Sequence, residues 1–150
     1  MSMWIFLQAL PPSAVPADHA GCDAFFDLDF DELGRRVEAG DAVWLNHGFF
    51  QLNEVYWPPA TPGGDPELPV FGGRHIEDPG GGPGHTALTP EEVARAAAFL
   101  ARTDFPTLWN AREETDADLR DHLAANHAEL RAFYARAARR GLSVLKHFSF

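Results

Sequence analysis

Histidine and carboxylate residues gather in the middle of the chain, where their chemistry suits a metal ion or general acid–base catalysis. The set comprises His47, His75, Glu77, Asp78 and His85. Imidazole and carboxylate groups are ligands of zinc and iron, and the His-x-Glu spacing places His75 and Glu77 on one side of an extended segment. A glycine turn would return His85 toward them. The spacing matches no helical metal motif, so the pattern favours loop residues bonded to backbone, and we expect neither a metal nor a cofactor.

A glycine run, Gly80-Gly81-Gly82-Pro83-Gly84, lies between these histidines. Glycine-rich loops bind phosphate where they lead directly into the N-terminus of a helix. Here residues 85–88 separate the run from the next helix start, no Walker pattern is present, and Pro83 lacks an amide donor. The run therefore favours a turn over a phosphate site.

Aromatic side chains lie among amide side chains in residues 44–57. They are Trp44, Phe49, Phe50, Tyr56 and Trp57, with Asn46, Gln51 and Asn53 between them. Such mixtures line ligand pockets and interfaces, but aromatic residues also build cores. We expect Trp44 and Phe49 in the core, whereas the following Pro58-Pro59 favours a more exposed edge for Tyr56 and Trp57.

The net charge of −10 is concentrated in the first half of the chain. Residues 1–70 carry 11 acids against Arg35 and Arg36, or −9, whereas residues 71–150 carry 11 acids against 10 bases, or −1. Nucleic-acid binding needs a basic surface that this chain lacks, and an anionic membrane surface would repel it.

Aspartates and phenylalanines alternate in the acidic segment 23–41. Asp27, Asp29 and Asp31 lie among Phe26 and Phe30. Acidic surfaces bind basic proteins through electrostatic complementarity, as inhibitors of basic enzymes do. A run of charge is also commonly just a solvated face, and both interpretations stay open.

Several other classes are excluded by composition. Cys22 is the single cysteine, so an intramolecular disulfide and a multi-cysteine zinc site are ruled out. No Ser-His-Asp or nucleophile-elbow signature is present. No apolar run approaches the roughly 20 residues of a membrane span.

Because Met1–Leu7 lacks the basic region of a signal peptide, we expect a cytoplasmic protein. Many arginines beside a single lysine are typical of a GC-rich bacterial genome.

The order of apolar runs predicts one α+β domain over residues 1–150. Strands are predicted at 3–10 and 142–148, and we expect these two to pair in a small sheet with helices on one face. A helix is predicted within 17–40, and Asp41 would cap a second helix through Val43–Leu45. Seven of the twelve prolines lie in 58–84, which predicts a long irregular loop with a short edge strand at 68–71.

The last third of the chain has the clearest signals. Thr89-Pro90-Glu91-Glu92 predicts a capped helix that ends near residue 102, and a short helix is expected at 106–112. Thr115–Asp118 begins the longest helix, which Gly141 ends. Its apolar stripe is Leu119, Leu123, His127, Leu130, Phe133, Tyr134 and Ala137.

Two segments carry a resemblance to a known family. The first runs from Phe71-Gly72-Gly73-Arg74-His75-Ile76-Glu77-Asp78 through Gly82-Pro83-Gly84 to Leu88-Thr89-Pro90-Glu91-Glu92-Val93, and the second joins Leu130-Arg131-Ala132-Phe133-Tyr134 to Arg139-Arg140-Gly141 and an apolar strand. They resemble the YfbM-like family of bacterial proteins, domain of unknown function 1877. The resemblance is close over residues 68–148 and loose over 1–57. It implies a single α+β domain and supplies no catalytic residues.

These observations favour a non-enzymatic binding domain whose acidic face, Asp27, Asp29 and Asp31, contacts a basic protein partner, as in an inhibitor or an immunity protein. The alternative is a small-molecule-binding protein or enzyme with an aromatic and histidine-lined pocket. The candidate residues for that pocket are Trp44, His47, Tyr56, Trp57, His75, Glu77, Asp78 and His85. An enclosed pocket at the histidines would favour the alternative, and an acidic patch around exposed aromatic residues would favour the binding domain.

Overall fold

A computed structural model describes residues 3–57 and 65–150, which form one five-stranded sheet and its covering helices. The strands are β1 (Trp4–Leu10), β2 (Ala42–Asn46), β3 (Arg74–Ile76), β4 (His85–Leu88) and β5 (Ser143–Ser149). The helices are the 3₁₀ turn η1 (Pro12–Ala14), α1 (His19–Phe26), α2 (Phe30–Glu38), α3 (Phe49–Tyr56), α4 (Pro90–Arg102), α5 (Phe105–Asn110) and α6 (Ala117–Arg139). Residues 58–64, the start of the expected irregular loop, lie outside the described residues.

The sheet is antiparallel throughout, in the order β2-β1-β5-β4-β3. β5 pairs with β1 in a register that places Phe148 opposite Ile5 and Ser143 opposite Leu10. The predicted α+β class is confirmed, and so is the pairing of the first and last strands.

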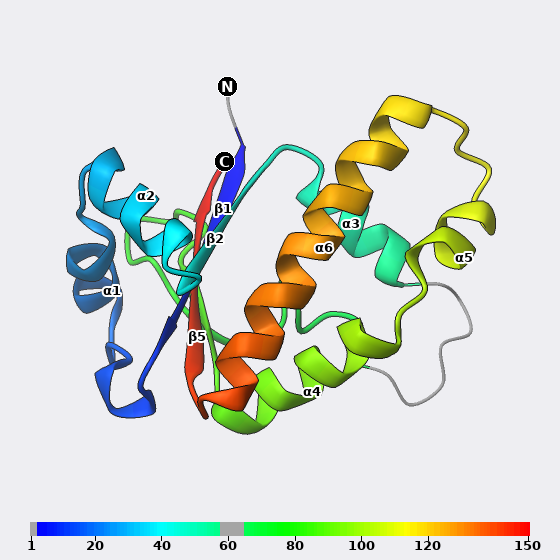
Figure 1. Cartoon of the computed structure of the whole chain (residues 1–150). Coiled ribbons are helices and arrows are strands. Elements are labelled where there is room, and N and C mark those ends of the chain that lie inside the picture. Colours follow the sequence, from blue (N-terminus) through cyan, green and yellow to red (C-terminus); the bar gives the residue numbers. More distant parts are fainter. Residues whose placement is uncertain (1–2, 58–64) are drawn as a thin grey trace.

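Helices cover both faces of this sheet, not one face as expected (Figure 1). On one face α3, α4 and α6 enclose a large core that includes Leu7 and Val144. On the other face α1 and α2 lie over a smaller cluster that joins Leu10, Cys22 and Leu145. Neighbouring residues of a strand point to opposite faces. The near-continuous apolar runs of β1 and β5 are therefore explained by burial on both faces.

Residues 17–40 form two short helices instead of one. Each begins at an aspartate, because Asp18 accepts a hydrogen bond from the Gly21 amide and Asp29 accepts one from the Glu32 amide. Side-chain acceptors at this position satisfy amides that lack a partner in the first turn. The acid at position 29 is thus both a cap and part of the acidic segment.

The helix predicted after Asp41 is wrong, because β2 occupies this segment. Ala42–Asn46 pair with β1, so that Trp44 lies opposite Phe6. A run as short as Val43-Trp44-Leu45 has no helical period to distinguish it from a strand. Residues 68–71, predicted as an edge strand, form turns, and β3 and β4 follow them.

The helices of the last third begin and end close to the predicted residues. Thr89 and Glu92 form the complete capping box of α4, and α6 buries its predicted stripe from Leu123 to Ala137. In the part of the chain that the structure describes, no helix combines the length and the apolarity that crossing a membrane requires.

The only lysine of the chain, Lys146, is fully buried on β5. Its Nζ donates hydrogen bonds to the carbonyl oxygens of Leu68 and Gly72, the latter at 2.8 Å. Tyr134 of α6 donates to the carbonyl oxygen of Pro69, also at 2.8 Å. These two side chains tie the turns before β3 to the sheet and to α6. Burial lowers the pKa of Lys146 well below its usual value.

The buried lysine makes stability depend on pH in the alkaline range. Between the lowered pKa in the folded state and the usual value of 10.5, the unfolded chain binds more protons, so the free energy of unfolding rises with pH. The slope reaches about 1.4 kcal/mol per pH unit. Urea unfolding of the wild type and Lys146→Met at a series of pH values should show the difference between them moving in favour of the wild type as pH rises. A constant difference would mean that Lys146 keeps its usual pKa.

Tyr56 and His127 form a buried polar contact between α3 and α6. The Tyr56 hydroxyl lies 2.8 Å from His127 Nδ1, and both side chains are buried. Burial lowers the pKa of His127, and Arg131 lowers it further. The neutral imidazole can therefore accept a hydrogen bond that the Tyr56 hydroxyl donates. Tyr56, expected nearer an exposed edge, lies instead in the core.

Removing this hydroxyl should destabilise the protein measurably. Tyr56→Phe leaves His127 Nδ1 buried without its donor, which costs about 1–2 kcal/mol of unfolding free energy. Trp57→Phe is the matched control, because Trp57 is 53% exposed, and it should change stability by no more than about 0.5 kcal/mol. Chemical denaturation measures both values. Equal effects of the two substitutions would contradict the buried contact.

Candidate functional site

α1 and the sheet bring three histidines and an aspartate together. His19 and Asp23 are one helical turn apart on α1, and the resulting i, i+4 spacing places them on the same side. His85 of β4 lies directly opposite His147 of β5 in the strand register. These four residues, His19, Asp23, His85 and His147, are called the histidine–aspartate cluster below.

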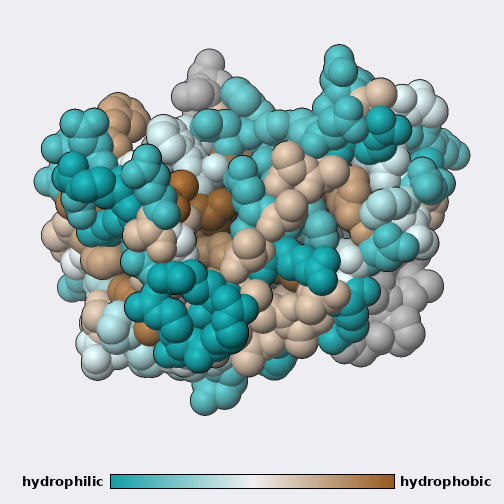
Figure 2. Space-filling model, viewed as in Figure 1, coloured by the Kyte–Doolittle hydropathy of each residue, from teal (hydrophilic) through white to brown (hydrophobic). Residues whose placement is uncertain are grey.

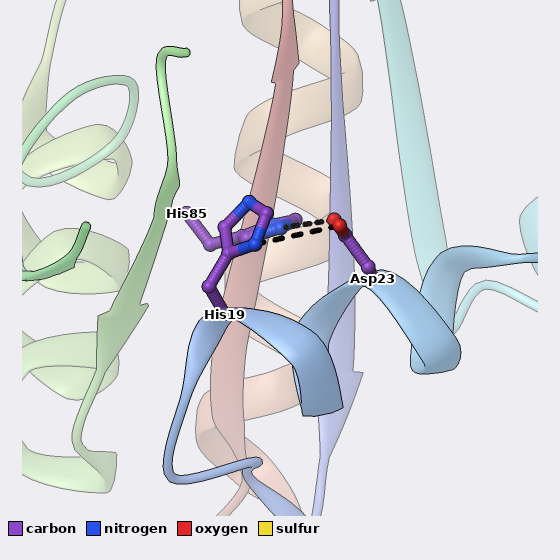
Figure 3. Close-up of side chains that lie close together, drawn as sticks. All are labelled: His19, Asp23 and His85. Carbon is purple, nitrogen blue, oxygen red and sulfur yellow. Dashed lines mark hydrogen bonds and ion pairs between the residues drawn. The ribbon is translucent and has the colours of Figure 1, made fainter. Parts of the chain in front are cut away.

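Within this cluster the Asp23 carboxylate contacts two neighbouring imidazole rings, those of His19 and His85 (Figure 3). Its Oδ1 lies 3.0 Å from His85 Nε2, and its Oδ2 lies 3.4 Å from His19 Nδ1. On the far side of the His85 ring, Nδ1 lies 3.4 Å from His147 Nδ1. The His85 side chain is 1% exposed and the Asp23 side chain is 55% exposed. The cluster is therefore buried where it meets the sheet, at His85, and accessible to solvent at Asp23.

The glycine run positions Asp78 beside the cluster. Asp78 Oδ1 lies 3.7 Å from His19 Nε2, and the carboxylate accepts hydrogen bonds from the amides of Gly80 at 2.7 Å and Gly82 at 3.0 Å. A Cβ atom at residue 82 would collide with the Asp78 carboxylate. The run is thus a turn folded around an aspartate, as its predicted turn chemistry implies.

Two groups of the cluster region have shifted pKa values. Burial, and after it the neighbouring His85, lower the pKa of His147 to about 4, so this imidazole is neutral at pH 7. The amide of Gly80 chiefly lowers the pKa of Asp78, with His19 and the Gly82 amide acting in the same direction. The cluster therefore combines a neutral imidazole at its base with a firmly ionised carboxylate at its rim.

Aromatic and sulfur side chains close the cluster from the α1 side. The Phe26 ring stacks on His85 with centroids 5.7 Å apart and an angle of 7° between the rings, and it lies 5.1 Å from the His147 ring. Cys22 is fully buried one residue before Asp23. Burial raises the pKa of its thiol, in keeping with a core residue.

The structure separates the histidine and carboxylate residues that the sequence analysis grouped. His85 lies opposite Ile76, and His75 lies opposite Thr86. Because side chains alternate along a strand, His75 lies on the other face of the sheet, beside Phe148. The expected return of His85 to His75 does not occur; of that group His85 belongs to the histidine–aspartate cluster and Asp78 lies 3.7 Å from its His19.

His47 lies away from the cluster, and Glu77 lies at its edge, where no ion pair joins it to the described residues of the cluster. His47 is exposed in the turn between β2 and α3, where its φ is 52°. Glu77 is exposed at the end of β3, beside a shallow cavity of about 520 Å³ that His19 and His75 also line. Neither this cavity nor the one beside Phe148 contains more than one of His47, His75 and His85.

The aromatic residues are dispersed too. Phe49 is in the core and Trp57 is exposed, as predicted, whereas Tyr56 is in the core against expectation and Trp44 is only partly buried. Trp44 is half-buried and stacks on Phe30, with centroids 5.9 Å apart and 14° between the rings. An aromatic and histidine-lined pocket of the predicted composition therefore does not form.

Trp44 instead lines a groove beside β2, the edge strand of the sheet. The groove has a volume of about 690 Å³ and lies between α2, β2 and α6. Figure 2 shows brown, hydrophobic atoms deep in a hollow between these elements, with teal side chains around it. Its lining residues are Gly34, Val37, Glu38, Gly40, Ala42, Val43, Trp44, Asn46, Glu129, Ala132, Phe133 and Arg136.

The predicted acidic face lies at the entrance to α2, next to this groove. Asp27, Asp29 and Asp31 are all exposed. Between them Phe30 leaves 75% of its surface exposed. An acidic patch around an exposed aromatic residue is thus present, which is the arrangement expected for the binding interpretation.

Sequence reasoning did not connect His19, Asp23 and His147 with His85. The i, i+4 spacing of His19 and Asp23 is a local signal that could have paired them. The meeting of His85 with His147 depends on the register between β4 and β5, which join residues 62 positions apart. No local pattern specifies that register.

Comparison with known proteins agrees with the fold. The crystal structure of a protein of unknown function, YfbM from Escherichia coli, is similar to this chain with a TM-score of 0.61 and 12% sequence identity, over 97% of this chain and 99% of that chain. At this identity the similarity shows the fold alone. None of the curated proteins compared with the chain matches it.

The resemblance found in the sequence is confirmed by a family model. The model of the domain of unknown function DUF1877 matches residues 59–147, which include the segments that carried the resemblance. The match spans more than half of the chain and includes β3, β4, α4, α5 and α6. The chain therefore belongs to the DUF1877 family.

Proposed function

We propose that this protein is a non-enzymatic binding domain that contacts a basic protein partner through an acidic face at α2, in the manner of an inhibitor or immunity protein. The observation that carries the proposal is Phe30, which is 75% exposed between the exposed residues Asp29 and Asp31. Aromatic residues at the centre of an interface contribute much of its binding energy. Charges around them steer the partner and select it.

The charge of this face is available to a partner. Within residues 3–57 and 65–150, Asp27, Asp31 and Glu38 form no ion pair. Neighbouring acids differ, because Glu32 pairs with Arg35 at 2.7 Å and Asp41 pairs with Arg140 at 2.7 Å. Arginines thus neutralise Glu32 and Asp41, whereas Asp27 and Asp31, on either side of Phe30, keep their charge unpaired in the described part of the chain.

The groove beside β2 extends the same surface. Val37, Trp44 and Phe133 give it an apolar lining, and Glu38 and Glu129 stand on opposite walls. Trp44 connects the groove to the acidic face, because its ring stacks on Phe30. An apolar centre with a charged rim is the common anatomy of protein interfaces. A basic partner would insert apolar side chains into the groove and place cations at the rim.

Neutralising the acidic face should slow association with the partner. The partner is isolated from the native host on the immobilised chain, purified, and its association is measured at low and high salt. Asp27→Asn/Asp29→Asn/Asp31→Asn should reduce the association rate and its salt dependence, because steering by exposed charge is screened by salt. Stability should stay within about 0.5 kcal/mol, because these acids are exposed and asparagine also caps helices.

A matched control removes the same charge elsewhere. Glu113→Gln/Asp118→Asn/Asp121→Asn changes three exposed acids near the start of α6, and it should leave most of the association rate unchanged. Phe30→Ala should act mainly by speeding dissociation, whereas Phe50→Ala, at a residue 38% exposed on α3, should not. An association rate that ignores salt, or an equal loss in both triple variants, would contradict the proposed face.

A further inference from the structure

We propose that His19, Asp23 and His85 form a binding site for one divalent transition-metal ion of the zinc type. Neither the acidic face nor the groove takes part, so this site is independent of the proposed protein contact. It joins α1 to β4, the elements that Figure 3 shows on either side of the three side chains. The chemical class of the ligand follows from the donors, which are two imidazole nitrogens and a carboxylate oxygen.

The donor atoms are already grouped at a spacing that a metal can use. One ligand atom from each of the three side chains lies within 4.8 Å of the others. Asp23 Oδ1 and His85 Nε2 are 3.0 Å apart, and Asp23 Oδ2 and His19 Nδ1 are 3.4 Å apart. Ligand atoms around a tetrahedral zinc ion, at bonds of about 2.0–2.1 Å, are separated by roughly 3.3 Å. Binding would therefore require His19 and Asp23 to move so that any pair of donors still as far apart as 4.8 Å reaches this spacing.

Each imidazole also has a partner on its outer nitrogen. His85 Nδ1 faces His147 Nδ1 at 3.4 Å, and His19 Nε2 faces Asp78 Oδ1 at 3.7 Å. Metal-binding histidines almost always present their second ring nitrogen to a carboxylate, a backbone carbonyl or water, which fixes the ring orientation and the tautomer, and Asp78 is such a carboxylate beside His19. Asp78 in turn is fixed by the Gly80 and Gly82 amides. The surroundings of a metal site are therefore present together with its donors.

The site is rigid on one side and accessible on the other. His85 lies in the sheet under the stacked Phe26 ring, and this packing restricts the motion of its imidazole. Asp23 is 55% exposed and His19 is 18% exposed, which gives an ion a path from solvent. Three protein ligands leave a fourth position of a tetrahedral ion for water. Two nitrogen donors select zinc and cobalt over magnesium and calcium, which prefer oxygen ligands.

The test uses the tag-free full chain, freed of metal with a chelator, and titrates it with zinc and with cobalt. The wild type should bind one zinc ion per chain by calorimetry, its melting temperature should rise with zinc, and cobalt should give the visible absorption of a tetrahedral complex. Magnesium should produce none of these signals. X-ray absorption of the zinc form should show nitrogen and oxygen neighbours and no sulfur, which separates this site from one at Cys22.

Variants identify the ligands. His19→Gln and Asp23→Asn lie on the accessible side of α1 and should each weaken zinc binding by at least roughly 10-fold, while the metal-free proteins melt as the wild type does. His75→Gln is the matched control, because His75 is exposed on the other face of the same hairpin, and it should bind zinc normally. The proposal is overturned if the wild type binds no stoichiometric zinc, if sulfur is found at the metal, or if His75→Gln weakens binding while the α1 variants do not. The X-ray absorption result on the wild type decides the matter even where a variant fails to fold.

Discussion

The antiparallel pairing of β5 with β1 on one side and β4 on the other is the constraint on which the rest of the structure depends. This pairing joins the first described strand to the last and places β4 in the sheet. Its register sets His147 opposite His85. The alternation of side chains then sends Lys146 to the opposite face, where it binds the turns that lead into β3. A slip of one residue would exchange these roles and bury neither face correctly.

The two faces of the sheet consequently differ in what they bury. The face under α3, α4 and α6 holds the large core, where Lys146 and Tyr134 bond to backbone carbonyls and the Tyr56 hydroxyl bonds to His127. The face under α1 and α2 carries polar side chains that bond to one another, in the histidine–aspartate cluster. The histidine–aspartate cluster, with its exposed Asp23, thus lies in the thinner layer, which also bears the acidic face.

The sequence predicted those features that local physics specifies. The capping box of α4, the stripe of α6 and the pairing of the first and last strands of the chain follow from spacing, caps and apolar runs. The helix expected after Asp41 was wrong because a three-residue apolar run has no period, and the sheet recruited it as β2. The acidic face around Phe30 was anticipated from charge alone, whereas the cluster depends on a distant strand register that charge and spacing do not encode.

The unequal cores on the two faces have a consequence for the dynamics of the molecule. The cluster under α1 and α2 contains far fewer buried side chains than the core under α6, and segments with little buried apolar area open at a lower free energy than the whole chain. We expect α1 and α2 to exchange their amide hydrogens through a local opening that leaves the rest folded. A protein or an ion that binds this layer would therefore lower the population of the locally opened state, and part of its binding free energy would be used to keep α1 and α2 closed.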